Sequence, residues 1–344
     1  MADEMRRIAL AARPQGAPRP TDFRLETAPV PEPAEGEFLA RTLWLSLDPY
    51  MRGRMDDVAS YAPPVPLGGT MEGECVAEVV ASRHPGFAVG EIVAGRFGWT
   101  SHAVSGGAGV RRVDPALGPV STALGVLGMP GHTAWVGLNE IGEGRNGETI
   151  VVSAATGAVG SLACQLARIK GMRVIGVAGG AEKCAYAVEK LGCDACLDHR
   201  GADAATLSAR IAEAAPQGVD VYFENVGAAT LAAVLPLMNV HGRIAVCGMI
   251  GWYSGRGAAD PMPLPPVWRL ILTRRLRAQG FIIFDHEASR PIFLQEVAPM
   301  LREGRIRWRE SVAEGLEAAP EAFISMLEGG NFGKQLVRVA APSA

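Results

Sequence analysis

The chain has 344 residues, with 33 Lys and Arg against 36 Asp and Glu, which gives a formal net charge of -3. This length predicts two domains, because a domain usually holds about 100–200 residues. No basic stripe offers a footprint for a phosphate backbone, so a nucleic-acid partner is not expected. A turn signal interrupts the uncharged stretch Thr149–Ala167, and the N-terminal apolar run Ile8–Ala12 is too short for a signal peptide. We therefore predict no membrane segment.

The six cysteines indicate a protein of the reducing cytoplasm, because a disulfide framework is not expected in a chain of this size. Cys193 and Cys196 are three residues apart, yet no second thiol or histidine pair accompanies them in the sequence. Their spacing therefore predicts no metal site.

The first part of the chain, from Met1 to about Ser121, has a β-like pattern. Alternating segments such as Glu37–Leu47 and Val76–Ala81 are separated by clusters of Pro and Gly, as at Ala62–Gly69. Short strands at this spacing predict a compact, barrel-like β domain.

The next region alternates apolar strands with helices, a pattern that predicts a doubly wound parallel sheet. The expected strands are Thr149–Ala155, Arg173–Ala178, Ala195–Leu197, Val219–Glu224 and Arg243–Cys247. The expected helices are Val159–Lys170, Glu182–Leu191, Ala204–Ala215 and Ala229–Met238.

The last part of the chain begins with the proline-rich segment Pro261–Pro266. We expect it to lead into a helix (Val267–Arg275), a last strand (Ala278–Phe284) and one more helix (Pro291–Glu303). The tail Arg309–Val339 includes an expected strand at Gln335–Val339. It does not continue the βα pattern, and it does not match a domain of its own. We therefore predict one domain from residues 1–121 and 304–344, and a second from residues 122–303.

The strongest local motif lies between Val151 and Gly160, where an apolar strand runs into a turn and a helix. The helix start, near Val159, presents free N–H groups and a positive dipole end to a pyrophosphate. Gly157 allows the backbone to approach the phosphates, and Gly160 allows the helix to pack on the strand. Ala155 replaces the first glycine of the usual motif, so the βαβ context carries the prediction of a dinucleotide site. The alternative is a glycine-containing turn of another kind of α/β protein.

The end of the following strand favours NADPH over NADH. It reads Ala178-Gly179-Gly180, without the acidic residue that holds the ribose hydroxyls of NAD. This leaves room for a 2′-phosphate, and Lys183, one of only four lysines, is a suitable cation for it. The alternative is that Lys183 is a solvated lysine in the first turn of a helix.

Four segments together resemble a known family over nearly the whole chain. They are Leu45–Arg52, Ala154–Gly160, Tyr222–Gly227 and Asn331–Lys334. The resemblance is to the prostaglandin reductase/alkenal double-bond reductase branch of the medium-chain dehydrogenase/reductase superfamily, which includes curcumin-reductase-like proteins. It implies an α/β chain with a GroES-like β-barrel catalytic domain and a Rossmann domain, homodimers, and NADPH-dependent reduction of the C=C bond of α,β-unsaturated aldehydes and ketones.

The resemblance also implies particular site residues. Cofactor contacts are implied for Gly157, Ala158, Val159, Gly160, Lys183, His199, Asn225, Cys247, Gly248, Tyr253, Phe281, Ile283 and Asn331. Two positions depart from the family pattern: Asp198-His199-Arg200 replaces an Asn-Tyr-Lys segment, and Glu74 stands where some plant members carry a tyrosine. The contact of His199 and Arg200 with a 2′-phosphate is therefore left open.

A zinc site is not expected. The stretch Gly69–Gly73 has no histidine where zinc-dependent relatives carry one, and residues 84–122 contain no cysteine. Without thiolates or a histidine cluster, neither a catalytic nor a structural zinc can be held.

Conjugate reduction works without such a Lewis acid, because a hydride adds to the β-carbon and the resulting enolate needs a hydrogen-bond donor. Tyr50 and Tyr253 are the candidate catalytic donors, expected to meet across an interdomain cleft. Alternatively, Tyr253 orients the cofactor and Tyr50 only shapes the pocket. Arg52 is either a structural ion-pair partner or a substrate contact, and Trp99 and Trp252 are expected to be pocket or core aromatics.

Two other functions remain open from the sequence. One is an NADPH:quinone reductase on the same scaffold, which an assay with a quinone against an enone would distinguish. The other is a non-catalytic protein that binds NADPH, which any turnover of an enone would exclude.

Overall fold

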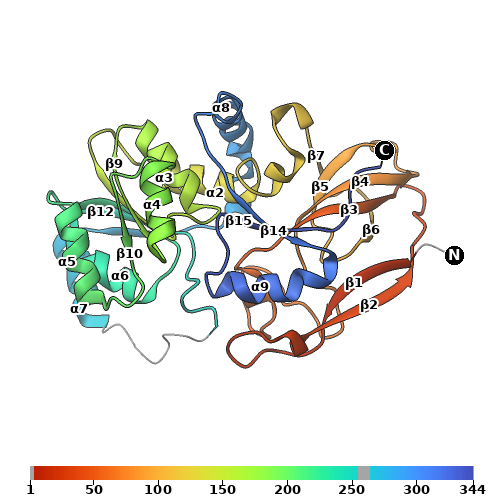
Figure 1. Cartoon of the computed structure of the whole chain (residues 1–344), viewed down its shortest axis with the longest axis horizontal. Helices are drawn as coiled ribbons and strands as arrows, with labels where there is room; N and C mark the ends of the chain where they lie inside the picture. The colour runs from red at the N-terminus through yellow and green to blue at the C-terminus, as the bar shows by residue number, and fades with distance from the viewer. Residues whose placement is uncertain (1–3, 255–263, 344) are drawn as a thin grey trace. The chain divides into compact units, whose positions relative to one another are not determined.

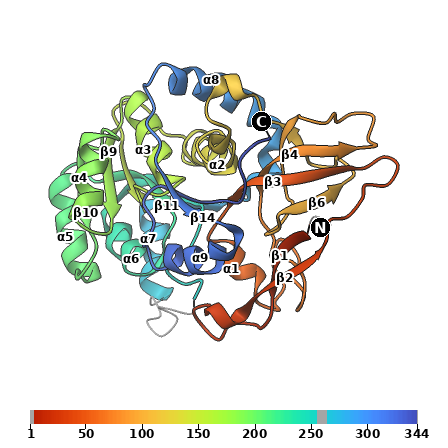
Figure 2. The same cartoon turned by 45° about the vertical axis from the view of Figure 1, so that its right-hand side comes forward.

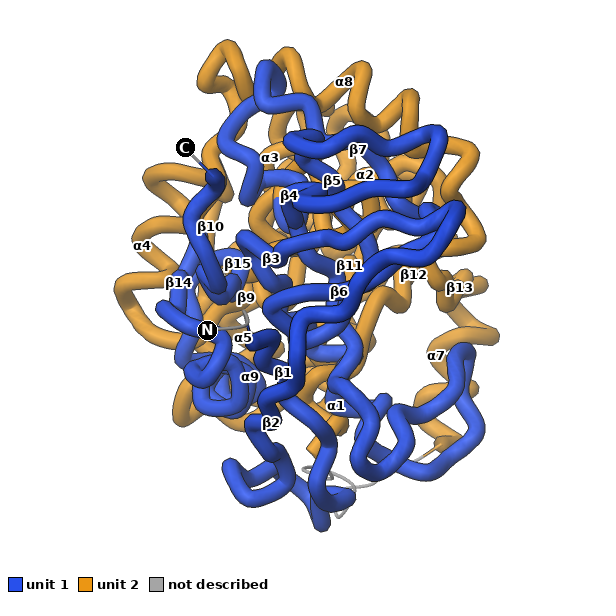
Figure 3. Tube along the Cα trace, turned by 90° about the vertical axis from the view of Figure 1, so that its right-hand side faces the viewer, with its two compact units in different colours: residues 1–125, 310–344 blue, residues 126–309 orange. Residues whose placement is uncertain are grey.

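The computed structural model describes residues 4–254 and 264–343. They form two compact units: unit 1 contains residues 1–125 and 310–344, and unit 2 contains residues 126–309 (Figure 3). The expected domains, 1–121 with 304–344 and 122–303, place both junctions a few residues earlier. No helix in the described part of the chain has the length and apolar character needed to cross a membrane.

Unit 2 is built on a parallel sheet whose described strands have the order β10-β9-β8-β11-β12-β13. The strands are β8 (Thr149–Ser153), β9 (Arg173–Ala178), β10 (Ala195–Asp198), β11 (Val219–Glu224), β12 (Met238–Val246) and β13 (Arg277–Gly280). Every residue of β8 is buried, as expected for a central strand covered on both faces. From β8 the chain first adds β9 and β10 on one side and then crosses to add β11, β12 and β13 on the other, so the strand order switches between β8 and β11. In open α/β sheets, ligands bind at the carboxyl ends of the strands beside such a switch point.

Helices cover both faces of this sheet. They are α2 (Met129–Val136), α3 (Gly160–Ile169), α4 (Ala181–Glu189), α5 (Ala204–Ala214), α6 (Ala228–Val234), α7 (Leu264–Arg274) and α8 (Arg290–Arg302). A common core joins α5, α6 and α7 to the side chains of Val151, Ile175 and Tyr222, and Figures 1 and 2 show these helices grouped together. The α3 and α4 connections run along the sheet in the opposite direction, so right-handed crossovers place them on the other face.

Several expected boundaries in unit 2 are wrong. The strand expected at Ala278–Phe284 ends at Gly280, because its partner β12 pairs with it only as far as Val246. The helix expected at Ala229–Met238 ends at Val234, where a 3-10 turn containing Pro236 (Leu235–Leu237) takes over. Proline lacks the N–H that would continue the helix. Met238 already belongs to β12, which begins five residues before the expected Arg243.

Two further differences have local causes. β8 ends at Ser153 and not at Ala155, because Ala154 has a φ of 49° that no strand tolerates. Part of the expected Pro261–Pro266 lead-in lies outside the described residues, and α7 begins at Leu264 rather than Val267. Prolines fit the first turn of a helix, whose N–H groups have no intrahelical partner. The helix α2 contains His132, where the sequence indicates the entry of a helix.

Unit 1 combines a mixed sheet with a separate hairpin. Its elements are β1 (Glu4–Leu10), β2 (Phe23–Pro29), β3 (Phe38–Ser46), α1 (Met51–Arg54), β4 (Cys75–Ser82), β5 (Ile92–Gly95), β6 (His102–Ser105), β7 (Arg111–Arg112), β14 (Glu310–Glu314), α9 (Ala319–Leu327) and β15 (Lys334–Arg338). The described strands of the larger sheet have the order β14-β15-β3-β4-β5-β7, and β6 also pairs with β3. The C-terminal tail therefore adds β14 and β15 to a sheet formed by the first part of the chain.

The core of unit 1 lies between the β1–β2 hairpin, the larger sheet and α9. Trp99 is fully buried there and stacks on Phe23, with ring centroids 5.6 Å apart. The ring of Phe323 on α9 meets Trp99 edge-on at 5.6 Å. Trp99 is therefore a core residue and not part of a site.

Candidate active site

The turn after β8 brings the start of α3 close to the strand. A side-chain carbon at position 160 would lie 2.3 Å from the carbonyl oxygen of Ala154, so only glycine permits this packing. Val159 is the N-cap residue, and no side chain caps the helix. The segment Gly157–Gly160 thus leads into a helix N-terminus whose main-chain N–H groups suit an anion such as a pyrophosphate.

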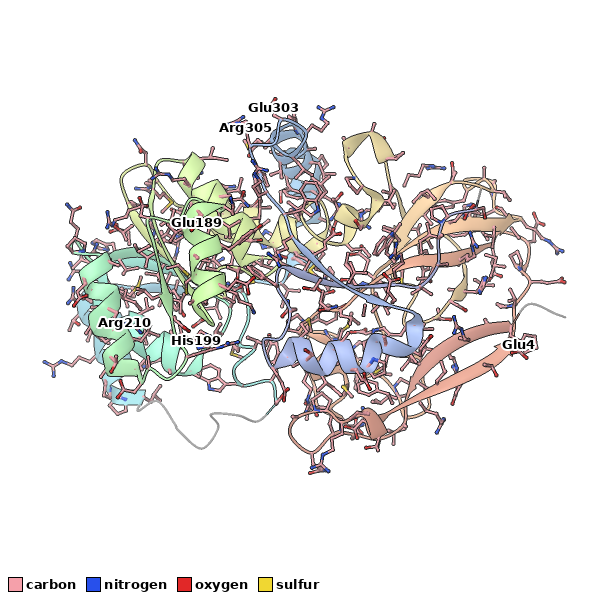
Figure 4. All side chains as sticks on the ribbon, viewed as in Figure 1. Glu4, Glu189, His199, Arg210, Glu303 and Arg305 are labelled. Carbon is pink, nitrogen blue, oxygen red and sulfur yellow. The ribbon has the colours of Figure 1, made fainter. Side chains whose placement is uncertain are left out.

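Basic side chains gather at the carboxyl ends of β9 and β10. A side-chain carbon at Gly179 would lie 3.0 Å from the Nε2 of His199 and 3.2 Å from the Nε of Arg200. Partial burial lowers the pKa of Lys183, and the positive charge of Arg200 lowers it further. Figure 4 labels His199 at the end of β10. Three basic side chains from two segments thus lie close enough to influence one another.

The acidic residue at the end of β10 is hydrogen-bonded to the main chain. One carboxylate oxygen of Asp198 accepts hydrogen bonds from the N–H groups of Gly180 (2.8 Å) and Arg200 (2.9 Å). These two bonds hold the pKa of Asp198 below its usual value. Asp198 therefore fixes the main chain at Gly180 and Arg200, next to the basic side chains. The sequence did not predict this role.

The carboxyl ends of β8 and β11 are joined by polar side chains. The N–H of Asn225 donates to the Ser153 hydroxyl at 2.8 Å, and the Asn225 side-chain amide donates to the Ser153 carbonyl at 2.8 Å. Glu224 is buried, and its Oε1 accepts hydrogen bonds from the N–H groups of Val226 (2.6 Å) and Gly227 (2.9 Å). Burial raises the pKa of Glu224. A Ser and a Glu at the ends of apolar strands were the available signal, and the sequence reasoning gave neither side chain a role.

The segment that follows β12 carries Cys247, Gly248 and Tyr253. The phenol oxygen of Tyr253 accepts a hydrogen bond from the N–H of Met249 at 3.2 Å. Burial raises the pKa of the Cys247 thiol to about 12, so it stays protonated and is no nucleophile at neutral pH. The ring of Trp252 packs so closely on Gly227 that a side-chain carbon there would lie 2.7 Å from it.

Phe281 and Ile283 lie beyond the end of β13 and not within a strand. Ile283 is buried and opens a 3-10 turn, Ile283–Ser289. The main chain here is therefore not engaged in the sheet ladder, which ends at Gly280.

In unit 1, Tyr50 stands at the N-cap of α1. Burial and the nearby carboxylates of Asp48 and Glu72 raise its pKa well above the ordinary value, so the phenol keeps its proton. The Arg54 guanidinium lies 5.9 Å from the centre of the Tyr50 ring and binds Glu72 at 2.9 Å.

Arg52, the other arginine of α1, has structural contacts. It forms an ion pair with Asp56 at 2.7 Å and donates to the Gly16 carbonyl at 2.7 Å. Of the two interpretations left open for Arg52, these contacts support the ion-pair partner.

A buried ion pair connects the turn before Tyr50 to the C-terminal tail. The ammonium of Lys334 binds the Asp48 carboxylate at 2.7 Å and the Leu47 carbonyl at 2.7 Å, and both charged side chains are less than 10% exposed. Ser46 donates to the second oxygen of Asp48. Asn331 lies three residues before Lys334, and its amide donates to the Gly333 carbonyl at 2.7 Å. The sequence did not predict this pair.

Four cysteines of unit 2 come together although they are spread over 33 positions of the sequence, from Cys164 to Cys196. The neighbouring Cys193 raises the pKa of the Cys164 thiol, and burial together with Cys184 raises that of Cys196. The expectation that Cys193 and Cys196 lack companions therefore holds in the sequence but not in space. Among the described residues, no group of three or more His, Cys, Asp or Glu side chains is arranged to hold a metal ion.

Unit 2 thus gathers most of the expected cofactor residues at one edge of its sheet. The glycine turn, the basic cluster, Asn225 and the Cys247–Tyr253 segment all follow the carboxyl ends of β8, β9, β10, β11 and β12. Tyr50 and Asn331 belong to unit 1. An edge with a helix N-terminus, basic groups and main-chain donors fits a phosphorylated dinucleotide.

Comparison with known proteins identifies the class. The N-terminal domain model of oxidoreductases matches residues 6–113, and a model described as zinc-binding dehydrogenase matches residues 158–298. The chain belongs to the medium-chain dehydrogenase/reductase superfamily, which confirms the expected combination of a GroES-like domain and a Rossmann domain.

Within that superfamily, the chain belongs to the branch of the curcumin, prostaglandin and alkenal reductases, as expected. It is 48% identical to the NADPH-dependent curcumin reductase of Escherichia coli (strain K12) over 337 residues, 97% of each chain. It is 41% identical to prostaglandin reductase 1 of Rattus norvegicus over 328 residues, 94% of this chain and 96% of the relative. The crystal structure of CurA in complex with NADPH from Vibrio vulnificus is 45% identical, with a TM-score of 0.92 over 98% of this chain and 100% of that one.

Proposed function

We propose that this protein is an NADPH-dependent reductase of the C=C bond in α,β-unsaturated aldehydes and ketones. The observation that carries the proposal is the basic cluster of Lys183, His199 and Arg200 beside an uncapped helix start. Such a cluster suits the extra phosphate of NADPH. The chain's similarity to the curcumin and prostaglandin reductases supports the reaction class.

The chain's own residues divide the cofactor among them. We propose that Gly157, Ala158, Val159 and Gly160 bind the pyrophosphate, Lys183 and His199 the 2′-phosphate, and Asn225 the adjoining ribose. Cys247, Gly248 and Tyr253 would line the nicotinamide, and the main chain at Phe281 and Ile283 would meet its carboxamide. Asn331 is proposed as a cofactor residue from the resemblance. When bound, NADPH supplies the hydride for the β-carbon of the substrate.

The phenols are the proposed catalytic donors. Conjugate addition places negative charge on the substrate's carbonyl oxygen, and a hydrogen-bond donor there stabilises it. Tyr50 keeps its proton because burial and two carboxylates raise its pKa, so it acts as a donor and not as a base. Tyr253 is proposed either for the same task or for holding the ribose, since its oxygen already accepts a main-chain hydrogen bond.

A turnover assay tests the proposal. Purified protein, NADPH and an α,β-unsaturated ketone are mixed, the loss of NADPH absorbance is followed, and the product is identified by mass spectrometry. We expect the saturated ketone, and NADH should support a much slower reaction. Consumption of NADPH with a quinone but with no enone would instead identify a quinone reductase, and no turnover with either would leave a binding protein.

We further propose that the protein is a homodimer of the cytoplasm. Its six cysteines are free thiols, in keeping with a reducing compartment. β13 is an exposed edge strand, and the neighbouring helix α7 exposes Leu264, Trp268 and Leu272 by 62%, 65% and 75%. An edge strand beside an apolar helix face favours pairing with a second copy. Light scattering should show a dimer that Trp268→Glu dissociates and that the control Trp308→Glu leaves intact.

A further inference from the structure

We infer that Glu224 is a positioning residue for the proposed cofactor site at the carboxyl ends of the strands of unit 2. Its carboxylate fixes the main chain that carries Asn225 and the Cys247–Tyr253 segment. The inference rests on the proposed function, because it concerns how the chain binds a nicotinamide dinucleotide. Glu224 is not among the residues proposed above to bind the cofactor itself.

The carboxylate is placed to hold three donors at once. Its Oε1 accepts from the N–H groups of Val226 and Gly227 and from the Ser153 hydroxyl at 3.1 Å. These donors come from the end of β8 and from the turn that enters α6. One oxygen atom therefore links the carboxyl ends of β8 and β11, the two strands between which the strand order switches.

The turn that Glu224 holds is conformationally unusual. Gly227 has a φ of 77° and Ala228 a φ of 48°, so two successive residues with positive φ lie at the start of α6. A non-glycine residue in this region costs free energy unless its surroundings fix it. Without the carboxylate, two buried N–H groups would also lose their acceptor, and an unsatisfied buried donor is costly.

The main chain at Glu224 in turn carries the next segment. Its carbonyl accepts from the N–H groups of Cys247 (2.9 Å) and Gly248 (3.1 Å), and the Asn225 carbonyl accepts from Ile250 (3.2 Å). The start of the segment that bears Tyr253 is thus hydrogen-bonded to the main chain of residues 224 and 225. A shift of this turn would move Asn225 and the start of the Cys247–Tyr253 segment together.

The surroundings show that Glu224 is not held for packing alone. Its second oxygen, Oε2, and the Tyr222 hydroxyl on the same strand are buried without a partner of normal hydrogen-bond geometry. Removing a carboxyl from water costs free energy, so an apolar side chain would fill the space at less cost. What an apolar side chain would lack is the acceptor for Ser153, Val226 and Gly227.

The test compares Glu224→Ala and Glu224→Gln with Met238→Ala. Met238 is fully buried in the core that contains Tyr222, but it lies at the start of β12, the opposite end of that strand from the site. The Kd for NADPH is measured by titrating the fluorescence of the bound nicotinamide, and Tm is measured for each variant without cofactor.

We expect Glu224→Ala to raise the Kd about tenfold or more. Glu224→Gln should raise it much less, because the amide oxygen can accept the same three donors. Met238→Ala should lower Tm while leaving the Kd within about twofold of wild type, since its cavity lies away from the edge. Ser153→Ala, which removes one donor, supports the inference with a smaller rise in Kd if Glu224→Ala does not fold.

The inference is overturned if Glu224→Ala, or Ser153→Ala in its place, binds NADPH as tightly as wild type. It is also overturned if Met238→Ala weakens NADPH as much as Glu224→Ala for the same loss of Tm. A wild-type protein with no affinity for NADPH would reject the proposed function itself, which separates the two failures.

Discussion

Each unit buries a carboxylate next to residues of the candidate site, and the two carboxylates have different partners. In unit 1, Asp48 binds the ammonium of Lys334, so opposite charges neutralise each other. In unit 2, Glu224 accepts hydrogen bonds from two main-chain N–H groups and a hydroxyl, and none of these three donors is a cation. The first arrangement connects distant parts of one unit, whereas the second orients main-chain groups at the edge of a sheet.

The same contrast extends to the basic side chains. Unit 1 pairs its buried Lys334 with a carboxylate, while unit 2 gathers Lys183, His199 and Arg200 around a two-glycine turn. Burial lowers the pKa of His199, and the positive charges of Arg200 and Lys183 lower it further. A bound anion relieves such repulsion. The Lys334–Asp48 pair thus connects distant segments of unit 1, whereas the basic cluster of unit 2 is the proposed site of the 2′-phosphate.

Breaking the unit 1 pair should have the largest effect. Lys334→Met leaves Asp48 buried without its counter-charge, and we expect a loss of about 3–5 kcal/mol in the free energy of unfolding. Denaturant titration measures the loss, and the double variant Lys334→Met/Asp48→Asn should recover part of it. The exposed pair Arg338–Glu314 is the control, because Arg338→Met should change stability little. Equal losses in the two single variants would remove the distinction between the pairs.

Removing a cation from the edge of unit 2 should act on binding and not on folding. We expect Lys183→Ala to weaken NADPH by about ten- to a hundredfold while leaving the weaker affinity for NADH nearly unchanged. Fluorescence titration with both cofactors measures the ratio of the two Kd values. The control is Lys190→Ala, because Lys190 is the C-cap residue of α4, at the opposite end of the helix from Lys183. If Lys183→Ala weakens both cofactors equally, Lys183 does not read the 2′-phosphate.

Removing the phenol hydroxyl should have different kinetic effects at Tyr253 and at Tyr50. Tyr253→Phe is expected to lower kcat/KM about ten- to a hundredfold, since water replaces a lost phenol donor only in part. Tyr50→Phe should change KM or substrate preference more than NADPH affinity. Steady-state kinetics with one enone and a cofactor titration give both answers. Wild-type rates in both variants would mean that neither phenol is a catalytic donor.

The pH dependence of Glu224→Gln should be a smaller effect. The folded carboxyl has a pKa raised above its ordinary 4.5, so the folded chain holds the proton more tightly than the unfolded chain. That stabilising contribution is complete below the unfolded pKa and is lost as the pH rises through the folded pKa. The stability of Glu224→Gln relative to wild type should therefore increase between acidic and alkaline pH, by on the order of 1 kcal/mol for each unit by which the pKa is raised. A stability difference that does not vary with pH would contradict this.

Chelation should have the smallest effect. Dialysis against a strong chelator is expected to leave activity and Tm unchanged, because the described residues offer no group of three metal ligands. Stoichiometric zinc in the purified protein, lost together with activity, would reject this.

The sequence by itself determined the local pattern of the fold. The strands β9 (Arg173–Ala178) and β11 (Val219–Glu224) have the predicted bounds to the residue, since a continuous apolar run between turn signals is a local property. The glycine turn and the missing acidic residue after β9 are each confined to a few neighbouring positions, so each could be recognised from the local sequence.

Only the tertiary structure decided which polar groups meet. Lys334 and Asp48 are 286 positions apart, and Asn225 reaches Ser153 across 72. Where β13 ends depends on the length of its partner β12, and not on its own apolar residues. Such contacts follow from strand register and from the need of buried polar atoms for partners, and neither is encoded in any single segment of the chain.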